Sequence, residues 1–336
     1  MLIHDPYYDV QGVSNSSLRY INPEENGSPV LFKEHWDGKT PSLKTSSLEF
    51  GNLLHLAVLE PHLCTYEVDR SNTPDKIRDI LKQMYSAINE SNKIAAAVTG
   101  DLEPIGQLDE YVYAIIEACD REAYGRTWKN ETRVNKIMSQ GAPYWELLRQ
   151  TEKFIITENQ LELMNCCIAG IKSNKKANDL IFNKTDTTTV YYNELEVYWR
   201  DDNYAFPLKG KIDRLKLDLK EKTFTIIDLK TTAKTLGQFK ESFEKYRYAR
   251  QMAFYTTAAQ EWLDQNGYKM YEALNPVICA VETKGANRAG LFQLSDQTWF
   301  KGVNEKKDLL ERLNHHFKND QWTDDMETDI DQRYFL

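Results

Sequence analysis

The chain has 336 residues, 41% of them hydrophobic, and a mean hydropathy of −0.62, the composition of an ordinary soluble protein with ample material for a core. It contains no apolar run of about 18 residues and opens on MLIHDPYYDV, which excludes a membrane-spanning helix and predicts no secretion signal. Five cysteines without CxxC spacing suggest neither a zinc nor an iron–sulfur site and indicate a cytoplasmic protein with reduced thiols.

Charge is distributed unevenly along the chain, whose net charge of −9 argues against a broad nonspecific nucleic-acid surface. Residues 201–250 contain twelve Lys and Arg against eight Asp and Glu, a local balance of +4, whereas residues 320–336 contain six acids and one Arg. This pattern is compatible with a protein that accepts an anionic polymer at one place only. It also predicts an acidic, peripheral C-terminal tail over 319–336.

The first half of the chain is expected to be mainly helical. Turn-forming residues dominate 1–45 and predict a loop-rich opening segment. A helix is expected to begin at Ser46, because SSLE has the form of a capping box between Ser46 and Glu49, and Pro61 closes it. From about 74 to 182, apolar residues recur at steps of three and four, which predicts a helical insertion.

The period of the pattern changes to two at residue 188, as expected for strands. In chain order we predict antiparallel strands over 188–199, 209–218 and 223–232, a long helix over 237–265, a strand over 275–283 and a helix over 296–317. The fold class is therefore α+β. We expect a single domain over 1–318, with the sheet and the helix that follows it at about 188–265.

Two carboxylates interrupt the alternation in the hairpin GKIDRLKLDLKEKTFTIIDLKTTAK, residues 210–234. Placing the turn within LKEK sets Leu215 opposite Ile226 and Asp213 opposite Asp228. Side chains paired in this way have Cβ atoms about 4.5–5.5 Å apart. Two like charges at that separation repel, so the pair needs a cation unless one acid stays protonated.

A divalent metal ion would resolve this repulsion. Carboxylate oxygens suit Mg²⁺ or Mn²⁺, which also accept substrate phosphates as ligands. Lys230 follows Asp228 by two residues and shares its face, where an ammonium could serve the attacking water or neutralise the transition state. The constellation predicts phosphodiester hydrolysis. The alternative is a surface network in which these charges pair with Arg214 or Lys211 and do no chemistry.

The same residues resemble a known family. Asp213, followed by IIDLKTT with Asp228 and Lys230, resembles the core of the PD-(D/E)xK nucleases, an acid on one strand and Asp/Glu-x-Lys on the next. The stretch GNLLHLAVLEP resembles the G-x-x-x-H-x-x-x-L-E-P helix of RecE-type exonucleases (exodeoxyribonuclease VIII-like) and RecB-like nucleases, with His55 at the histidine position. The fold implied is a mixed β-sheet flanked by helices.

Two further stretches extend the resemblance from residue 13 to about 260. YRYARQMAFYTTAA resembles the Q-x-x-x-Y helix of these nucleases, with Gln251 and Tyr255 at the motif positions. VSNSSLRYINPEENGSPVLFKEHW resembles the start of a RecE nuclease domain. The motifs occur in the order that the family has. The chain departs from some members in lacking a long N-terminal region.

The resemblance implies a role for each matched residue. Asp213, Asp228 and the Leu229 carbonyl would lie at a Mg²⁺ site that Mn²⁺ can also fill, His55 would contact this site or hold the phosphate, and Lys230 would serve the attacking water. A lone histidine within LLHLAVL also fits a satisfied core residue.

The helper residues have roles implied in the same way. Gln251 and Tyr255 would hold the DNA end or steady the catalytic lysine, although a pair four residues apart also fits an ordinary helix surface. Glu196 is a candidate for an acid behind the metal ligands. Further basic side chains are candidates for contacting DNA, namely Arg247, Arg214 and Lys211.

The function implied is a metal-dependent exodeoxyribonuclease that acts on linear double-stranded DNA. The resemblance implies 5′→3′ degradation that leaves a 3′ single strand for a single-strand annealing protein, a homo-oligomeric ring around DNA ends, and a phage or prophage origin in a bacterial cytoplasm. Two alternatives stay open. One is a non-catalytic DNA-end-binding scaffold of a recombination module, which the intact acids and lysine disfavour. The other is a structure-specific endonuclease.

Overall fold

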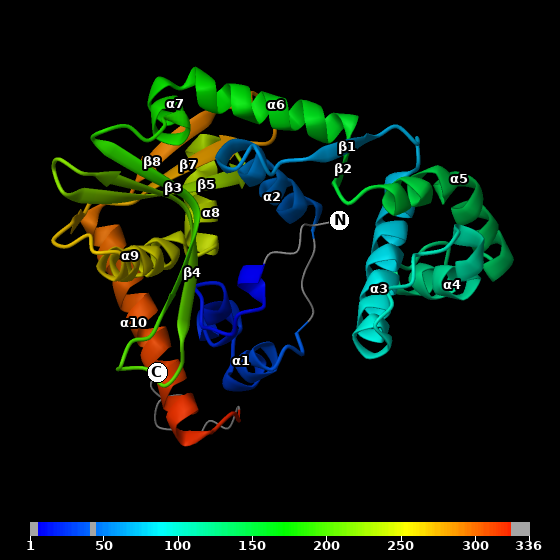
Figure 1. The fold of residues 1–336 in the computed structure, drawn as a ribbon, viewed down its shortest axis with the longest axis horizontal. Coiled ribbons are helices and arrows are strands. Elements are labelled where there is room, and N and C mark those ends of the chain that lie inside the picture. Colours follow the sequence, from blue (N-terminus) through cyan, green and yellow to red (C-terminus); the bar gives the residue numbers. More distant parts are fainter. Residues whose placement is uncertain (1–5, 41–44, 324–336) are drawn as a thin grey trace. The chain divides into compact units, whose positions relative to one another are not determined.

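The structure, a computed structural model, describes residues 6–40 and 45–323 (Figure 1). The chain divides into two compact units, each described by itself. The helical unit comprises residues 64–162, and the sheet unit comprises the described residues up to 63 and from 163 onward. The helical insertion predicted over 74–182 overlaps the helical unit without sharing its bounds. The single domain predicted over 1–318 stays a prediction.

The helical unit is built around three amphipathic helices. Its elements are β1 (Tyr66–Asp69), α3 (Asp75–Thr99), α4 (Val112–Arg121), α5 (Asn130–Gln150) and β2 (Phe154–Thr157). The helices pack together because their apolar residues recur at helical spacing, and Ile80, Ile115 and Ile137 are fully buried between them. The short strands β1 and β2 pair in parallel.

The sheet unit contains the six-stranded sheet. Its helices before the sheet are α1 (Pro29–Trp36), α2 (Ser46–Leu59), the C-terminal part of α6 (Glu158–Ser173) and α7 (Lys175–Phe182). Its strands are β3 (Thr189–Trp199), β4 (Leu208–Asp218), β5 (Thr223–Thr232), β6 (Glu272–Ala273), β7 (Val277–Glu282) and β8 (Ala289–Gln293). The later helices are α8 (Phe239–Lys245), α9 (Tyr248–Gln265) and α10 (Asp296–Asn319).

The sheet is mixed, with the strand order β3-β4-β5-β7-β8 and β6 paired to β5. β3, β4 and β5 are antiparallel in succession, as predicted, whereas β7 runs parallel to β5 and β8 runs antiparallel to β7. The prediction of an α+β fold with a central mixed sheet flanked by helices is therefore confirmed.

Helix α9 packs against β3, β4 and β5, α10 packs on α9, and α2 contacts β4 and β5. The close approach of α9 depends on Gly210 in β4, since a Cβ there would lie 3.2 Å from the Cβ of Ala258. The main core, which includes Ile212, Phe224 and Phe254, is fully buried or nearly so. This packing fixes α9 relative to the hairpin that carries the acids.

The hairpin has the register that the sequence predicts. Leu215 pairs with Ile226, and the chain reverses through residues 219–222. Pairing between β4 and β5 ends with Arg214 opposite Ile227. Asp213 lies one step beyond that last pair, where the strands begin to diverge.

Two local predictions were wrong. The N-cap of α2 is Thr45, whose Oγ1 accepts a hydrogen bond from Leu48 N at 3.2 Å, so the predicted capping box at Ser46 is not used. The helix expected over 237–265 is two helices, α8 and α9, which are separated at Arg247 with φ of +53°. The opening segment consists mainly of loops and turns, as predicted, and also contains helix α1. Of the predicted acidic tail, residues 324–336 lie outside the described residues.

Candidate active site

An irregularity in the β3–β4 pairing brings two acids together. Asn193 pairs with Arg214 and Leu195 pairs with Ile212, but Glu194, between the two pairs, has no partner in the register. Glu194 adopts a left-handed backbone with φ of +47°, which is unusual for a residue other than glycine. Because the flanking pairs keep one register, Glu194 stands opposite Asp213, which also has no ladder pair, and the two side chains lie together.

Asp213 and Asp228 meet where β4 and β5 diverge. Asp213 Oδ2 accepts a hydrogen bond from Leu229 N at 2.8 Å. Asp228 is completely buried, and its Oδ2 lies 2.6 Å from Lys230 Nζ, which is 3.9 Å from Asp213 Oδ2. One ammonium thus faces both carboxylates, as their shared face in the sequence predicts.

Burial and pairing set the charges of this trio. Burial raises the pKa of Asp228 to about 7, against the opposing effect of Lys230, and the charge on Asp213 raises it further. Burial lowers the pKa of Lys230, but Asp228 and Asp213 more than offset this and raise it. Lys230 is therefore an ammonium at neutral pH, suited to orienting a water or balancing negative charge and not to accepting a proton from its resting state.

His55 on α2 faces the same acids. Its Nε2 lies 2.7 Å from the Leu229 carbonyl oxygen, so Nε2 donates, and Nδ1 is directed at the acids, 3.6 Å from Asp213 Oδ2 and 3.5 Å from Glu194 Oε1. Burial lowers the pKa of His55, while Asp213 and Glu194 raise it, with a net rise. Both separations are long for hydrogen bonds. A cation placed between the imidazole and the two carboxylates could contact all three groups.

These residues fit a divalent cation. One ligand atom each from His55, Glu194 and Asp213 lies within 4.8 Å of the other two. Glu194 Oε1 and Asp228 Oδ1 are buried yet accept no hydrogen bond within the described part of the chain, although buried carboxylate oxygens are usually satisfied. Two carboxylates and an imidazole form a donor set that hard or borderline divalent ions accept. The Leu229 carbonyl adjoins the set through its bond to His55.

Gln251 and Tyr255 are joined to each other on α9, with Gln251 Nε2 donating to the Tyr255 hydroxyl at 3.0 Å. Burial raises the pKa of Tyr255, and the nearby Asp213 carboxylate adds to the rise. Tyr248, one turn earlier, places its ring centre 5.5 Å from Lys230 Nζ. Helix α9 therefore closes one side of the lysine.

The three basic candidates for DNA contact lie in different settings. Arg214 is only 3% exposed, stacks 4.1 Å from the Tyr191 ring and donates to Asn193 Oδ1 at 2.6 Å. Its guanidinium is committed to the fold and has almost no exposed surface to offer DNA, contrary to the expected contact. Arg247 is partly exposed and pairs with Glu24 at 2.6 Å.

Lys211 and Glu196 lie next to the acids. Lys211 Nζ is 3.8 Å from Glu194 Oε2 and 3.6 Å from Glu196 Oε1. Glu196 also accepts from the Tyr198 hydroxyl at 3.0 Å. Glu196, the strand β3 acid expected behind the ligands, thus reaches the site only through Lys211, and Glu194 occupies the position beside Asp213.

Sequence reasoning missed Glu194. A signal was present, because in TVYYNELEVYW the apolar positions change phase after Tyr192, from Val190 and Tyr192 to Leu195 and Val197. A change of phase within a strand indicates an irregular residue.

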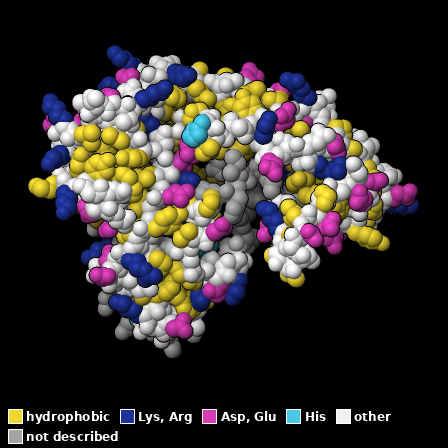
Figure 2. Space-filling model, in the orientation of Figure 1, with side chains coloured by type: hydrophobic (Ala, Val, Ile, Leu, Met, Phe, Trp, Pro, Cys, Tyr) yellow, Lys and Arg dark blue, Asp and Glu magenta, His cyan; other side chains and the backbone are white. Residues whose placement is uncertain are grey.

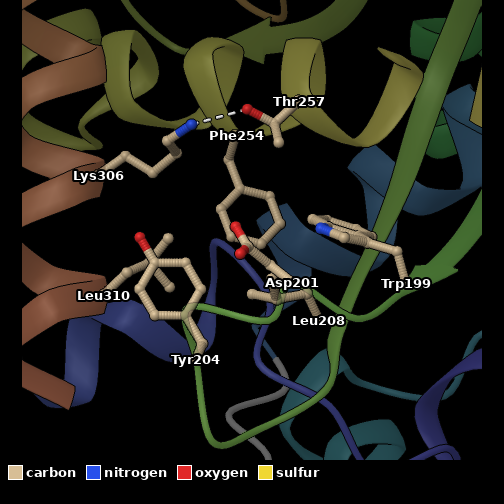
Figure 3. A pocket seen from close by; sticks show the side chains of 8 residues that line it. All are labelled: Trp199, Asp201, Tyr204, Leu208, Phe254, Thr257, Lys306 and Leu310. Carbon is tan, nitrogen blue, oxygen red and sulfur yellow. Dashed lines mark hydrogen bonds between the residues drawn. The ribbon is translucent and has the colours of Figure 1, made fainter. Parts of the chain in front are cut away.

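Figure 2 shows that basic side chains on the face drawn are interspersed with acidic ones and form no continuous basic patch. A cavity of about 50 Å³ lies between β3, α9 and α10, where Lys306 donates to Thr257 Oγ1 at 2.7 Å (Figure 3). A space of this size holds at most a few water molecules. No helix among the described residues has both the length and the apolar content to cross a membrane.

Comparison with solved structures supports the fold. A crystal structure of a protein from Eubacterium rectale named "Putative exonuclease" matches with a TM-score of 0.50 and 9% identity, over 99% of this chain and 91% of that one. A Vibrio cholerae protein matches with a TM-score of 0.16 and 11% identity, over 76% of this chain and 59% of that one, and carries no argument. No curated protein matches the sequence.

Comparison with protein families covers more than half of the chain. Residues 146–329 match a family described as a PDDEXK-like domain of unknown function (DUF3799). The matched region contains Asp213, the Asp-x-Lys segment from Asp228 to Lys230, and helix α9. The chain therefore belongs to this family of PDDEXK-like domains.

Proposed function

We propose that the protein is a Mg²⁺-dependent nuclease that hydrolyses phosphodiesters of linear double-stranded DNA, as an exonuclease that degrades 5′→3′. The observation that carries the proposal is the convergence of His55 Nδ1, Glu194 and Asp213 within 4.8 Å, beside the buried Asp228–Lys230 pair. Membership of a PDDEXK-like family supports a nuclease. The structural neighbour named as an exonuclease supports attack from DNA ends.

His55, Glu194 and Asp213 would hold the cation, with Asp228 behind them, whereas the Leu229 carbonyl, expected as a further ligand, here accepts a hydrogen bond from His55 Nε2. When bound, a divalent cation lowers the pKa of water and polarises phosphoryl oxygens. The protein itself positions the ligands. The hydrogen bond from Leu229 N fixes the Asp213 carboxylate, and the hydrogen bond from His55 Nε2 to the Leu229 carbonyl turns His55 Nδ1 toward the acids.

Lys230 supplies the positive charge on the other side of the acids. Its ammonium is held by Asp228 and covered by the Tyr248 ring, which keeps it in one orientation and restricts water. There it can orient the attacking water through a hydrogen bond and balance charge that develops on the phosphate. Gln251 and Tyr255 keep the adjoining stripe of α9 in a fixed conformation.

The test is degradation of linear duplex DNA labelled at either end, with a closed circular duplex of the same sequence as the matched control. The proposal predicts loss of the 5′ label first and an intact circle. Cutting of the circle would replace the exonuclease by a structure-specific endonuclease. We further propose that the 3′ strand passes to a single-strand annealing protein and that the chain assembles as a ring. Co-purification and light scattering test these two points.

A further inference from the structure

Arg247 occupies a fixed position beside the candidate active site. Its left-handed backbone ends α8 and starts α9. The Arg247 carbonyl accepts the Gln251 amide at 3.1 Å, so the two side chains are one helical turn apart. Tyr248 follows directly and contacts Lys230. A group bound at Arg247 would therefore lie near the reacting phosphate.

Arg250 lies three residues after Arg247. A comparison of the two shows why the carboxylate bound to Arg247 can be replaced by another anion. Arg250 is 2% exposed and donates to Glu25 Oε2 at 2.6 Å, Glu305 Oε1 at 3.1 Å and Asn15 Oδ1 at 3.1 Å. Its donors are committed inside the fold, where it ties the N-terminal segment to α9 and α10. Arg250 is therefore structural.

Among the residues that the structure describes, the nearest acidic partner of Arg247 is an exposed glutamate. Its guanidinium lies 2.6 Å from Glu24 Oε2 and 3.9 Å from Glu305 Oε1. The Glu24 side chain is 69% exposed, at the centre of the turn Pro23–Glu25. Exposed ion pairs contribute little to stability, and a phosphodiester offers the same two-oxygen geometry and the same single negative charge as the carboxylate. A phosphate can therefore take the place of the Glu24 carboxylate.

The residue directly before Arg247 in the chain, Tyr246, carries an exposed aromatic ring. Tyr246 is 54% exposed, and its ring centre is 5.8 Å from that of Tyr248, so its outer face can receive a base. Lys245 Nζ lies 5.3 Å from the Tyr246 ring centre and adds positive charge. A cation beside an exposed ring is suited to a nucleotide, because bases stack on aromatic side chains while the phosphate binds the cation.

We propose that Tyr246 and Arg247 form a nucleotide subsite at the α8–α9 break, and that Glu24 occupies it until a DNA strand displaces the carboxylate. The phosphodiester binds Arg247 and the base stacks on Tyr246. No covalent step is involved. The inference rests on the proposed function only in taking a nucleic-acid strand as the ligand.

The experiment measures binding of a short fluorescent linear duplex by anisotropy in EDTA, so that no cleavage intervenes. Glu24→Gln is expected to tighten the Kd about threefold to tenfold, by removing the competing carboxylate. The matched control is Glu34→Gln, an exposed acid on α1 that forms no ion pair with the residues described here. It removes the same charge and should leave the Kd unchanged.

A double-mutant cycle tests whether Glu24 affects DNA binding through Arg247. Arg247→Gln should weaken binding about tenfold, and Glu24→Gln in that background should give no further change. Tyr246→Leu should weaken binding, and Tyr246→Phe should not. Thermal unfolding of each variant checks that it is folded.

The outcomes separate this inference from the proposed function. Equal affinities for Glu24→Gln and Glu34→Gln, or tightening by Glu24→Gln that persists without Arg247, would overturn the subsite while the nuclease proposal stands. Absence of any DNA binding by the folded wild type in EDTA would overturn the subsite, while the nuclease proposal is decided separately by degradation of linear duplex DNA with Mg²⁺.

Discussion

Replacing Lys230 by Met tests the electrostatics at the centre of the site. Lys230 is the ammonium 2.6 Å from Asp228, which is completely buried. The pKa of Asp228 is already about 7 with the lysine present. Without the lysine the carboxyl stays protonated to higher pH, because charging it alone in the interior is unfavourable.

The pH dependence of the stability lost in Lys230→Met follows from the upward shift in the pKa of Asp228. A carboxyl whose folded pKa is raised contributes stability that is fully present below its unfolded pKa, about 4, and is lost as the pH rises through the folded pKa. In the wild type the decline in unfolding free energy stops near pH 7, the folded pKa of Asp228. In Lys230→Met the decline continues to higher pH, because the pKa of Asp228 is higher there. The difference in unfolding free energy should therefore be small at pH 6 and grow by about 1.4 kcal/mol per pH unit above pH 7, to about 3 kcal/mol at pH 9.

The assay is urea unfolding followed by circular dichroism in EDTA at pH 6, 7.5 and 9. The control is Asp228→Asn/Lys230→Met, which has no titrating carboxyl at this position and should show no growing loss. A loss in Lys230→Met of the same size at pH 6 and pH 9, or a double variant with the same pH dependence, would refute the reasoning.

Three further predictions concern single residues. Glu194→Gln should weaken Mn²⁺ binding at least about tenfold in a spin-resonance titration, whereas Glu196→Gln should not; equal effects would remove Glu194 from the ligand set. Arg214→Lys should lower the unfolding free energy by about 2–4 kcal/mol, through lost stacking and buried hydrogen bonds, without changing DNA affinity; a selective loss of DNA affinity would contradict its structural role. The bonds that Arg288 and the Leu236 amide donate to Glu282 lower the pKa of this carboxyl to about 2, so its stabilisation is present above about pH 4 and is lost as the pH falls toward 2. The gap in urea midpoint between wild type and Glu282→Gln should narrow over that range, and a constant gap would show that ionisation is not its cause.

The catalytic hairpin could be predicted from the sequence because its determinants are local. Alternation fixes which residues share a face, and the short turn at 219–222 fixes the register, so Leu215 meets Ile226 as expected. The placement of Lys230 beside Asp228 follows from the same period. Long-range contacts then add His55, whose position depends on how α2 packs on β4 and β5.

The features that were missed depend on contacts between distant segments. The left-handed conformation at Glu194 is accompanied by a bond from Asn193 Nδ2 to the Leu59 carbonyl at 2.6 Å. The change of phase within β3 marks an irregular residue but does not indicate this long-range contact. The break at Arg247 has no Gly or Pro to mark it. There, Gly302 of α10 packs so closely on Ala249 that a Cβ would lie 2.2 Å from the Ala249 carbonyl oxygen, and helical spacing in the sequence cannot show such a constraint.

The measurement that tests the central claim most directly is nucleotide release from linear duplex DNA by wild type and Lys230→Ala, each with Mg²⁺ and with EDTA. The account predicts release by the wild type with Mg²⁺ alone. DNA that the wild type binds but leaves intact in both Mg²⁺ and Mn²⁺, or equal release by folded Lys230→Ala, would contradict it.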